Sequence, residues 1–338
     1  MPRCIYCLED KPRAQFNREH VIQEGFGRFR GALTLKQMVC RVCNQHFGDT
    51  IDRELQREGA EGLERYRWGA KSPSEIGHFR YTNLTLRAKD AGDFADARFE
   101  LRPGNKPDDM VARLIPTVAF AKKDGTGFVE YTESQLKAEE WRQNPEIDWA
   151  KGVKAFASGD ELDRLIRLLE GQGVRPTLVR RFALPFKHGQ EITVQQTFTI
   201  TDGMSRALAK IAFNYLAHRE KPELVLRPAF DVVRRFVRYG EQPQLPPVHT
   251  SFDLPFRLPP EQTDRPVVHF VCIAPRYPTH NNLLGLVSLY GFLTHAVMLS
   301  EGYPGPWPKP HAHLYNPKDH TVHPWLPGVP FSPRGSPT

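Results

Sequence analysis

Two Cys-x2-Cys pairs near the amino terminus constrain the fold of this chain more than any other feature. Cys4 and Cys7 form the first pair, and Cys40 and Cys43 form the second. Four thiolates in this arrangement are the usual ligand set of a structural, tetrahedral zinc site. The gap between the pairs is longer than the roughly 15–20 residues usual in zinc ribbons, which leaves room for a functional hairpin between them.

Disulfide bonds and inert buried thiols are the alternatives to a zinc site. The chain begins Met1-Pro2-Arg3 and runs directly into the first Cys pair, without the apolar segment of a signal peptide. We therefore expect a reducing, cytoplasmic location, in which metal binding is favoured over disulfides. The fifth cysteine, Cys272, lies in an apolar, strand-like run and is expected in the core.

The segment between the Cys pairs contains a Glu-His dipeptide, Glu19-His20, within a strand-like run at 16–22. Adjacent residues of a regular strand point to opposite faces, so both side chains can serve one site only if the strand is bulged or ends there. Glycines at 25, 27 and 31 favour a turn, and residues 33–39 are predicted to form the return strand.

A helix is predicted from residue 43 to about residue 57, because apolar side chains recur on one face at Phe47, Ile51 and Leu55. Asn44 falls in the first turn of this helix, where it can reach outward or act as a helix cap.

The pattern CxxC…EHVI…VCxxCN…FG…ID, over residues 4 to about 55, resembles the HNH endonucleases, in the form stabilised by a zinc ion with four cysteine ligands. Similarity is looser at AKIAFNYL (209–216) and NLLGLVSLYGFL (282–293). The resemblance implies a ββα-metal fold in which His20 is the general base and Glu19 and Asn44 hold a catalytic divalent ion. The central Asn or His of the family has no match in residues 24–39, where Thr34 is the nearest polar side chain.

The chemistry of phosphodiester hydrolysis agrees with these residue types. The reaction needs an activated water and positive charge near the phosphate and the leaving oxygen. A neutral histidine accepts a proton near pH 7, and Mg²⁺ or Mn²⁺ prefers the oxygen ligands that Glu19 and Asn44 offer. A zinc ion held by four cysteines has no open coordination position for a substrate. Two metals are therefore implied, a structural zinc ion and a catalytic Mg²⁺ or Mn²⁺.

Each of these side chains also has a purely structural interpretation. The Glu-His dipeptide can be a surface pair, and Asn44 can be only a helix cap. His46 points elsewhere on the predicted helix and is not favoured as a ligand. Asp52 lies about 12 Å further along that helix and is expected in an outer shell or in packing.

The net charge of +7 suits a polyanionic partner, DNA in the first place and RNA as the alternative. Basic residues around the proposed site could hold phosphates, although a solvated charged face explains them equally well; they are Arg28, Arg30, Lys36 and Arg41. No run of about 18 apolar residues is present, so no membrane-spanning segment is expected.

The 338 residues are predicted to form an α+β protein in three parts. The zinc-stapled unit covers residues 1–68, a larger mixed α+β domain covers 69–300, and a proline-rich extended tail covers 301–338. Within the second part, 230–239 is predicted as a basic helix whose Arg234, Arg235 and Arg238 form a solvent-facing stripe, with contact to nucleic acid as the alternative. Residues 283–299 are predicted as a strand followed by a helix, with a second strand as the alternative.

The tail is expected to hold neither a helix nor an inner strand. Its histidines at 311, 313, 320 and 323 lack a carboxylate or cysteine at ligand spacing, so a metal site there is not favoured.

Three functions follow from these observations, in decreasing order of support. The first is a metal-dependent endonuclease that uses His20, Glu19 and Asn44. The second is a non-catalytic zinc-knuckle protein that binds nucleic acid, and the third is an adaptor for a protein partner. Cleavage under divalent ions separates the first from the second, and salt-dependent nucleic-acid affinity separates the second from the third.

Overall fold

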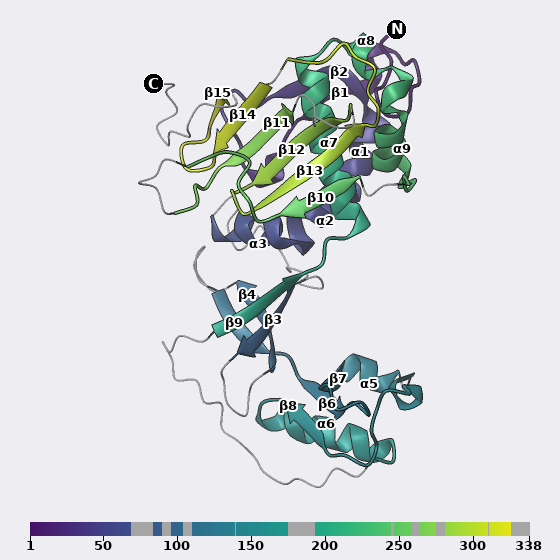
Figure 1. Cartoon of the computed structure of the whole chain (residues 1–338), viewed down its shortest axis with the longest axis vertical. Helices are drawn as coiled ribbons and strands as arrows, with labels where there is room; N and C mark the ends of the chain where they lie inside the picture. Colours follow the sequence, from purple (N-terminus) through teal and green to yellow (C-terminus); the bar gives the residue numbers. More distant parts are fainter. Residues whose placement is uncertain are drawn as a thin grey trace. The chain divides into compact units, whose positions relative to one another are not determined.

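The computed structural model of the chain describes residues 1–68, 84–89, 96–103, 110–138, 140–174, 193–244, 247–258, 264–274, 281–309 and 311–325. The chain splits into two compact units, both drawn in Figure 1. Unit 1 is Met1–Arg80, Asn105–Asp109 and Thr199–Thr338, and unit 2 is Tyr81–Gly104 and Met110–Phe198. These units cut across the predicted boundaries at 68 and 300, because the two ends of the chain share one core.

Unit 1 begins with the predicted ββα arrangement. Strands β1 (Phe16–His20) and β2 (Thr34–Cys40) are antiparallel, with the short 3-10 helices η1 (Arg13–Gln15) before β1 and η2 (Glu24–Phe26) after it. The helical part comprises α1 (Arg41–Asp49), α2 (Ile51–Glu58) and α3 (Ala60–Arg67). The prediction of one continuous helix to about residue 57 is wrong, because Thr50 leaves the helical region with φ −120° and ψ −96°. Gly48 and Thr50 are weak helix formers, which favours a break there.

A six-stranded antiparallel sheet forms the other side of unit 1 (Figure 1). Its order is β10 (Val248–Ser251), β13 (Leu293–Ser300), β12 (Leu283–Leu289), β11 (His269–Ala274), β14 (His311–Asn316) and β15 (Thr321–Trp325). The predicted helix after residue 283 is therefore wrong. Tyr290 and Gly291 have φ of 56° and 66°, and consecutive positive φ angles make the tight turn that joins two antiparallel strands.

The proline-rich tail also departs from its prediction, since β14 is an inner strand between β11 and β15. The hexapeptide HAHLYN contains no proline, so each residue keeps the N–H group that a central strand needs. Pro324 falls in β15, at the edge of the sheet, where a missing N–H group is tolerated.

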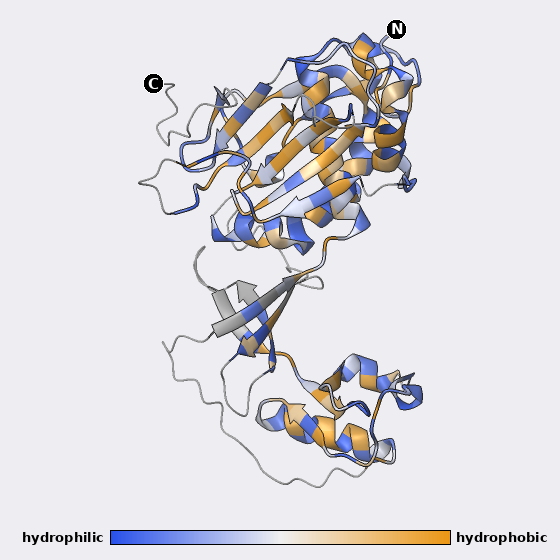
Figure 2. Cartoon of the chain, in the orientation of Figure 1, coloured by the Kyte–Doolittle hydropathy of each residue, from blue (hydrophilic) through white to orange (hydrophobic). Residues whose placement is uncertain are grey.

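Helix α7 (Asp202–Arg219) is the central element of unit 1. It contacts β11, β12 and β13 of the large sheet as well as β2 and α2, and its residues 207–217 are all buried. A helix that is apolar almost all round is buried all round, and Figure 2 shows many residues of the neighbouring strands β11, β12 and β13 in the colours of apolar residues. The sheet approaches closely: a Cβ added at Gly285 would lie 2.8 Å from Ala212 Cβ.

Three further elements follow α7, namely α8 (Pro222–Val225), η5 (Pro228–Phe230) and α9 (Asp231–Tyr239). Arg234 of α9 is 1% exposed, so its placement on a solvent-facing stripe is wrong. Its Nε donates to Ile5 O at 2.7 Å and its Nη2 donates to Val225 O at 2.7 Å. The guanidinium group thus satisfies buried carbonyl groups and fastens the loop between Cys4 and Cys7 to α9.

Buried His269 makes the stability of unit 1 sensitive to acid. Its Nε2 lies 3.2 Å from Phe26 O, and its Nδ1 accepts from Tyr290 N at 3.1 Å. Burial lowers the pKa of His269 to about 3, although the contact with Phe26 O acts in the opposite direction. Because the folded-state pKa is depressed, the neutral ring stabilises the fold fully above the unfolded pKa of about 6.5, and this stability is lost as the pH falls below it.

We therefore expect the wild-type protein to lose about 2 kcal/mol of unfolding free energy through this group between pH 7 and pH 5. Urea unfolding at the two pH values measures the loss, and His269→Gln should remove this part of it. The exposed residue His249 provides the control, since His249→Gln should keep the wild-type loss. An unchanged pH dependence in His269→Gln would contradict the assignment.

Unit 2 contains two small antiparallel sheets. One has the order β5 (Met110–Leu114), β4 (Arg98–Pro103), β3 (Leu84–Lys89) and β9 (Thr193–Phe198), and the other has the order β7 (Phe128–Thr132), β6 (Thr117–Ala121) and β8 (Val153–Phe156). Its helices are α5 (Glu133–Lys137), η4 (Glu140–Gln143) and α6 (Gly159–Gly171). Together the two units confirm the predicted α+β class. None of the helices in the described residues has the length and apolar character needed to cross a bilayer.

Candidate metal centre and nuclease site

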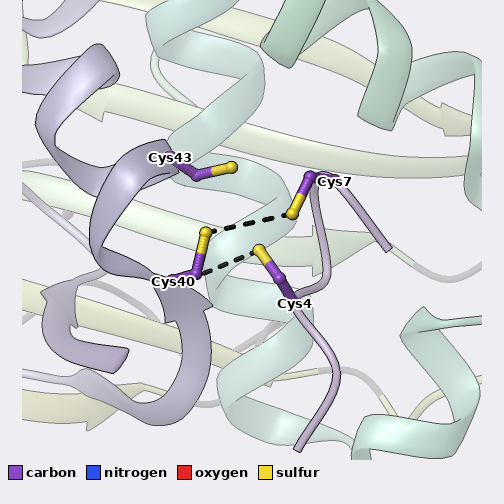
Figure 3. A group of neighbouring side chains, drawn as sticks. All are labelled: Cys4, Cys7, Cys40 and Cys43. Carbon is purple, nitrogen blue, oxygen red and sulfur yellow. Dashed lines mark hydrogen bonds between the residues drawn. The ribbon is translucent and has the colours of Figure 1, made fainter. Parts of the chain in front are cut away.

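The four predicted zinc ligands meet at one point of unit 1. Cys4 and Cys7 lie in the first loop, Cys40 ends β2, and Cys43 lies in the first turn of α1. Their sulfur atoms are all within 4.8 Å of one another, and Figure 3 shows the four side chains facing a common centre. Cys7 Sγ is 3.9 Å from Cys40 Sγ, and Cys40 N donates to Cys4 Sγ at 3.4 Å.

The chemistry of this thiol cluster suits a zinc ion. A hydrogen bond with Cys4 and burial raise the pKa of Cys43 far above its ordinary value, and repulsion from the charges of Cys4, Cys7 and Cys40 adds to this shift. A bound divalent cation removes that repulsion and allows all four sulfurs to ionise. All five cysteines are free thiols, and Cys272 is buried in β11 as predicted. The four clustered cysteines could therefore hold zinc.

The predicted general base is the last residue of β1, which lies opposite a bulge in β2. One residue of β1, between Asn17 and Glu19, faces three residues of β2, and Gln37 there has a φ of 56°. The extra residues lie in β2, whereas β1 itself ends at His20, and a strand that ends there is the other condition under which neighbouring side chains can serve one site. His20 is the last residue of β1 and pairs with Thr34, and its side chain is 19% exposed.

A carboxylate that the sequence did not single out accompanies His20. Glu24, in η2, places Oε1 3.4 Å from His20 Nε2. Burial lowers the pKa of His20, although the charge of Glu24 acts in the opposite direction. The imidazole is therefore neutral at pH 7 and able to accept a proton.

Glu19 points into the protein toward α7. Lys210 Nζ donates to Glu19 Oε1 at 2.6 Å and to Asp52 Oδ2 at 2.6 Å. Burial by itself would lower the pKa of Lys210, but the charges of Asp52 and Glu19 outweigh it and raise that pKa. The ammonium group is therefore charged, and it joins two carboxylates that are themselves nearly buried.

This ion pair belongs to a longer buried network. Asn214, one turn after Lys210 on α7, donates from Nδ2 to Glu19 Oε1 and to His20 O, both at 3.2 Å. Its Oδ1 accepts from the hydroxyl of Tyr6, in the loop between Cys4 and Cys7, at 2.7 Å. The network therefore connects the thiol cluster, the end of β1 and α7.

Asp52 is held on both of its oxygens, since Gln23 Nε2 donates to Oδ1 at 2.7 Å while Lys210 takes Oδ2. This environment leaves Asp52 a packing and charge-pairing role.

Asn44 is half-buried in α1, and its Nδ2 donates to Arg18 O at 3.4 Å. Two oxygens remain available beside this strand end, namely Asn44 Oδ1 and Glu19 Oε2. Neither has a hydrogen-bond partner among the described residues, and neither is among the polar atoms sealed from solvent. Carboxylate and amide oxygens are suitable donors for Mg²⁺ or Mn²⁺. Lys210 places an opposing positive charge on the same Glu19 carboxylate.

The four basic residues predicted to contact phosphates are all exposed. Arg28, Arg30, Lys36 and Arg41 lie in the segment from the loop after η2 to the start of α1. The backbone at Arg30 is fixed against the β14–β15 turn, since its N–H donates to His320 O at 2.8 Å. Arg41 Nη2 donates to Ala14 O at 3.1 Å.

Among the described residues, the thiol cluster is the one group of three or more His, Cys, Asp or Glu side chains close enough to hold a metal ion. It contains none of the tail histidines. His313 instead has Nδ1 2.7 Å from the hydroxyl of Tyr215.

Lys210, Asn214, Gln23 and Glu24 were not predicted as parts of this site. A usable signal existed for the first two, since Lys210 and Asn214 are the polar residues of AKIAFNYL and stand four positions apart, on one helix face. Glu24 stands four positions after His20, but no regular helix connects them. The spacing therefore did not predict that the two side chains lie close together.

Comparison with known proteins gives a match to the segment that contains the thiol cluster, the β1–β2 hairpin and α1. Residues 4–59 match the family model described as HNH endonuclease. The match indicates a nuclease-type, DNA-cleaving function for this segment. Neither the curated proteins nor the solved structures contain a significant match to the chain.

Proposed function

We propose, because residues 4–59 match the HNH endonuclease family model, that this protein is a metal-dependent endonuclease that hydrolyses phosphodiester bonds of DNA, with His20 as the general base. One observation carries the proposal. A partly exposed imidazole with a lowered pKa ends β1, next to Glu19 in the sequence, and Asn44 of α1 donates a hydrogen bond to Arg18 O of the same strand. The thiol cluster joins the first loop, the end of β2 and the start of α1.

His20 takes the proton from the attacking water. With Nε2 directed at Glu24, the tautomer that donates from Nε2 leaves Nδ1 as the proton acceptor. The hydrogen bond from Asn214 to His20 O holds the backbone at this position. The backbone contact and the contact of Nε2 with Glu24 together fix the orientation of the ring. Glu24 thus serves the orienting role for which no Asn or His exists in the loop.

Glu19 Oε2 and Asn44 Oδ1 would hold Mg²⁺ or Mn²⁺, which supplies positive charge for the scissile phosphate and the departing oxygen when bound. Arg28, Arg30, Lys36 and Arg41 provide exposed positive charge on the same segment for the phosphates to either side. Zinc in the thiol cluster has a structural role only, because four thiolate ligands leave no coordination position for the substrate.

A cleavage assay tests the function directly. The zinc-loaded, full-length chain should nick supercoiled plasmid in Mg²⁺ or Mn²⁺, and should not do so after removal of free divalent ions by a chelator that leaves the zinc in place. Single-stranded DNA and RNA of matched length establish which nucleic acid is preferred. Salt-dependent binding without cleavage under any divalent ion would instead support the zinc-knuckle binding protein. The contact of Lys210 with Glu19 is the observation that favours this second function, because it compensates the charge of a proposed ligand.

Glu24 offers a smaller test of the same site. Glu24→Gln should lower the turnover number about two- to five-fold and leave KM unchanged, because the carboxylate is half-exposed and such ion pairs contribute modestly. Steady-state cleavage of a short labelled duplex measures both constants. Glu9→Gln removes a surface carboxylate that pairs with Lys11 and should have the wild-type constants. A fall in affinity for the duplex without a change in turnover would contradict the orienting role of Glu24.

A further inference from the structure

Three charged side chains share one buried network beside the proposed divalent-ion site. Lys210, Glu19 and Asp52 are 1%, 5% and 7% exposed. One ammonium group contacts both carboxylates at 2.6 Å, so the three groups together carry a net charge of −1. The ammonium comes from α7, 191 positions away from Glu19 in the sequence.

This arrangement changes what Glu19 can offer to a divalent ion. Oε1 is occupied by Lys210 and Asn214, which leaves only Oε2. Any cation at Oε2 meets repulsion from a fixed positive charge on the other side of the same carboxylate, and this repulsion is poorly screened in a buried setting. Asn44 adds a neutral amide oxygen, so it supplies no negative charge to offset the positive charge of Lys210.

Lys210 is almost completely buried beside this carboxylate. Its side chain is 1% exposed, and its Nζ lies 5.3 Å from the ring centroid of Phe47. Asp52, the other partner of Lys210, is itself fixed by Gln23 at 2.7 Å. The positive charge is consequently a permanent part of the site.

We propose that Lys210 makes the divalent-ion site conditional on the substrate. In the free protein Glu19 and Asn44 bind Mg²⁺ or Mn²⁺ weakly, and the ion is retained when a DNA phosphate supplies the missing negative charge. Lys210 is a positioning residue that acts through Glu19, and Asn214 holds the same carboxylate in place. This inference rests on the proposed endonuclease function and adds to it an order of binding in which DNA precedes or accompanies the ion.

The test is Mn²⁺ binding to the zinc-loaded, full-length protein, measured from the free-ion signal in electron paramagnetic resonance. Lys210→Met alone would leave two buried carboxylates without a partner, which threatens folding. The double variant Asp52→Asn/Lys210→Met keeps the net charge of the network at −1, now on Glu19. Asp52→Asn alone is the matched control, because it keeps Lys210 on Glu19. Circular dichroism and zinc content establish that each variant is folded.

Wild-type protein and Asp52→Asn should bind Mn²⁺ weakly without DNA. Addition of a short duplex, in a His20→Ala background to prevent cleavage, should tighten Mn²⁺ binding on the order of ten-fold or more. The double variant should bind Mn²⁺ without DNA on the order of ten-fold more tightly than Asp52→Asn and gain little from the duplex. Equal Mn²⁺ affinity in the folded double variant and in Asp52→Asn would overturn the proposal.

The wild-type measurement keeps the inference testable even if the double variant does not fold. Mn²⁺ affinity that is the same with and without DNA overturns it directly. Cleavage by the wild-type protein together with DNA-independent Mn²⁺ affinity would refute the role of Lys210 and leave the endonuclease function standing. Absence of both cleavage and Mn²⁺ binding would refute the endonuclease function itself.

Discussion

His20→Ala is expected to lower the rate of divalent-ion-dependent plasmid cleavage by about three orders of magnitude. The substitution removes the group that we propose as the general base, and general base catalysis contributes about 10²- to 10⁴-fold. The side chain is partly exposed and ends a strand, so its truncation should leave the fold intact. Single-turnover cleavage at saturating Mn²⁺ measures the loss without interference from product release.

The exposed residue His249, in β10, supplies a matched control for this substitution. His249→Ala should cleave at the wild-type rate, and both variants should retain the wild-type zinc content. Equal cleavage by His20→Ala and wild-type protein would show that another group activates the water. A variant that has lost zinc would instead report on folding, so metal analysis accompanies every rate.

Replacement of a clustered cysteine is expected to have the largest effect on stability. Cys43→Ser should remove the zinc and lower the unfolding free energy by several kcal/mol, since structural zinc contributes about 10–16 kcal/mol to the folding of zinc-finger peptides. Less than that full amount should be lost here, because Phe47, Val39 and Tyr6 pack in the large core shared with α7 and the sheet. Zinc content, thermal unfolding and hydrogen exchange of residues 1–58 measure the outcome.

Cys272→Ser separates zinc loss from the loss of a buried thiol. Cys272 is 5% exposed in β11 and lies outside the thiol cluster. We expect this variant to keep one zinc ion per chain, with only the modest destabilisation of a core substitution. If Cys43→Ser kept its zinc and its hydrogen-exchange protection, the four cysteines would not be acting as a structural metal site.

The predicted pieces of the site that agree with the structure are all local in the sequence. The spacing of the Cys pairs, the strand that carries His20, the return strand and the helix that carries Asn44 lie within the first 58 residues. Ligand spacing, alternation and helical periodicity act over a few residues, so they can be read without knowing the rest of the fold. The break at Thr50 was missed because it concerns one residue within an otherwise regular helical pattern.

By itself, the sequence therefore determined the thiol cluster, the hairpin-helix unit and the candidate base. Only the tertiary structure decided that α7 completes this unit, that Glu19 shares an ammonium group with Asp52, and that residues 311–316 form an inner strand. These contacts join groups as many as 208 positions apart, across an intervening compact unit. Their partners are selected by packing and by the need to neutralise buried charge, and neither leaves a periodic pattern in the chain.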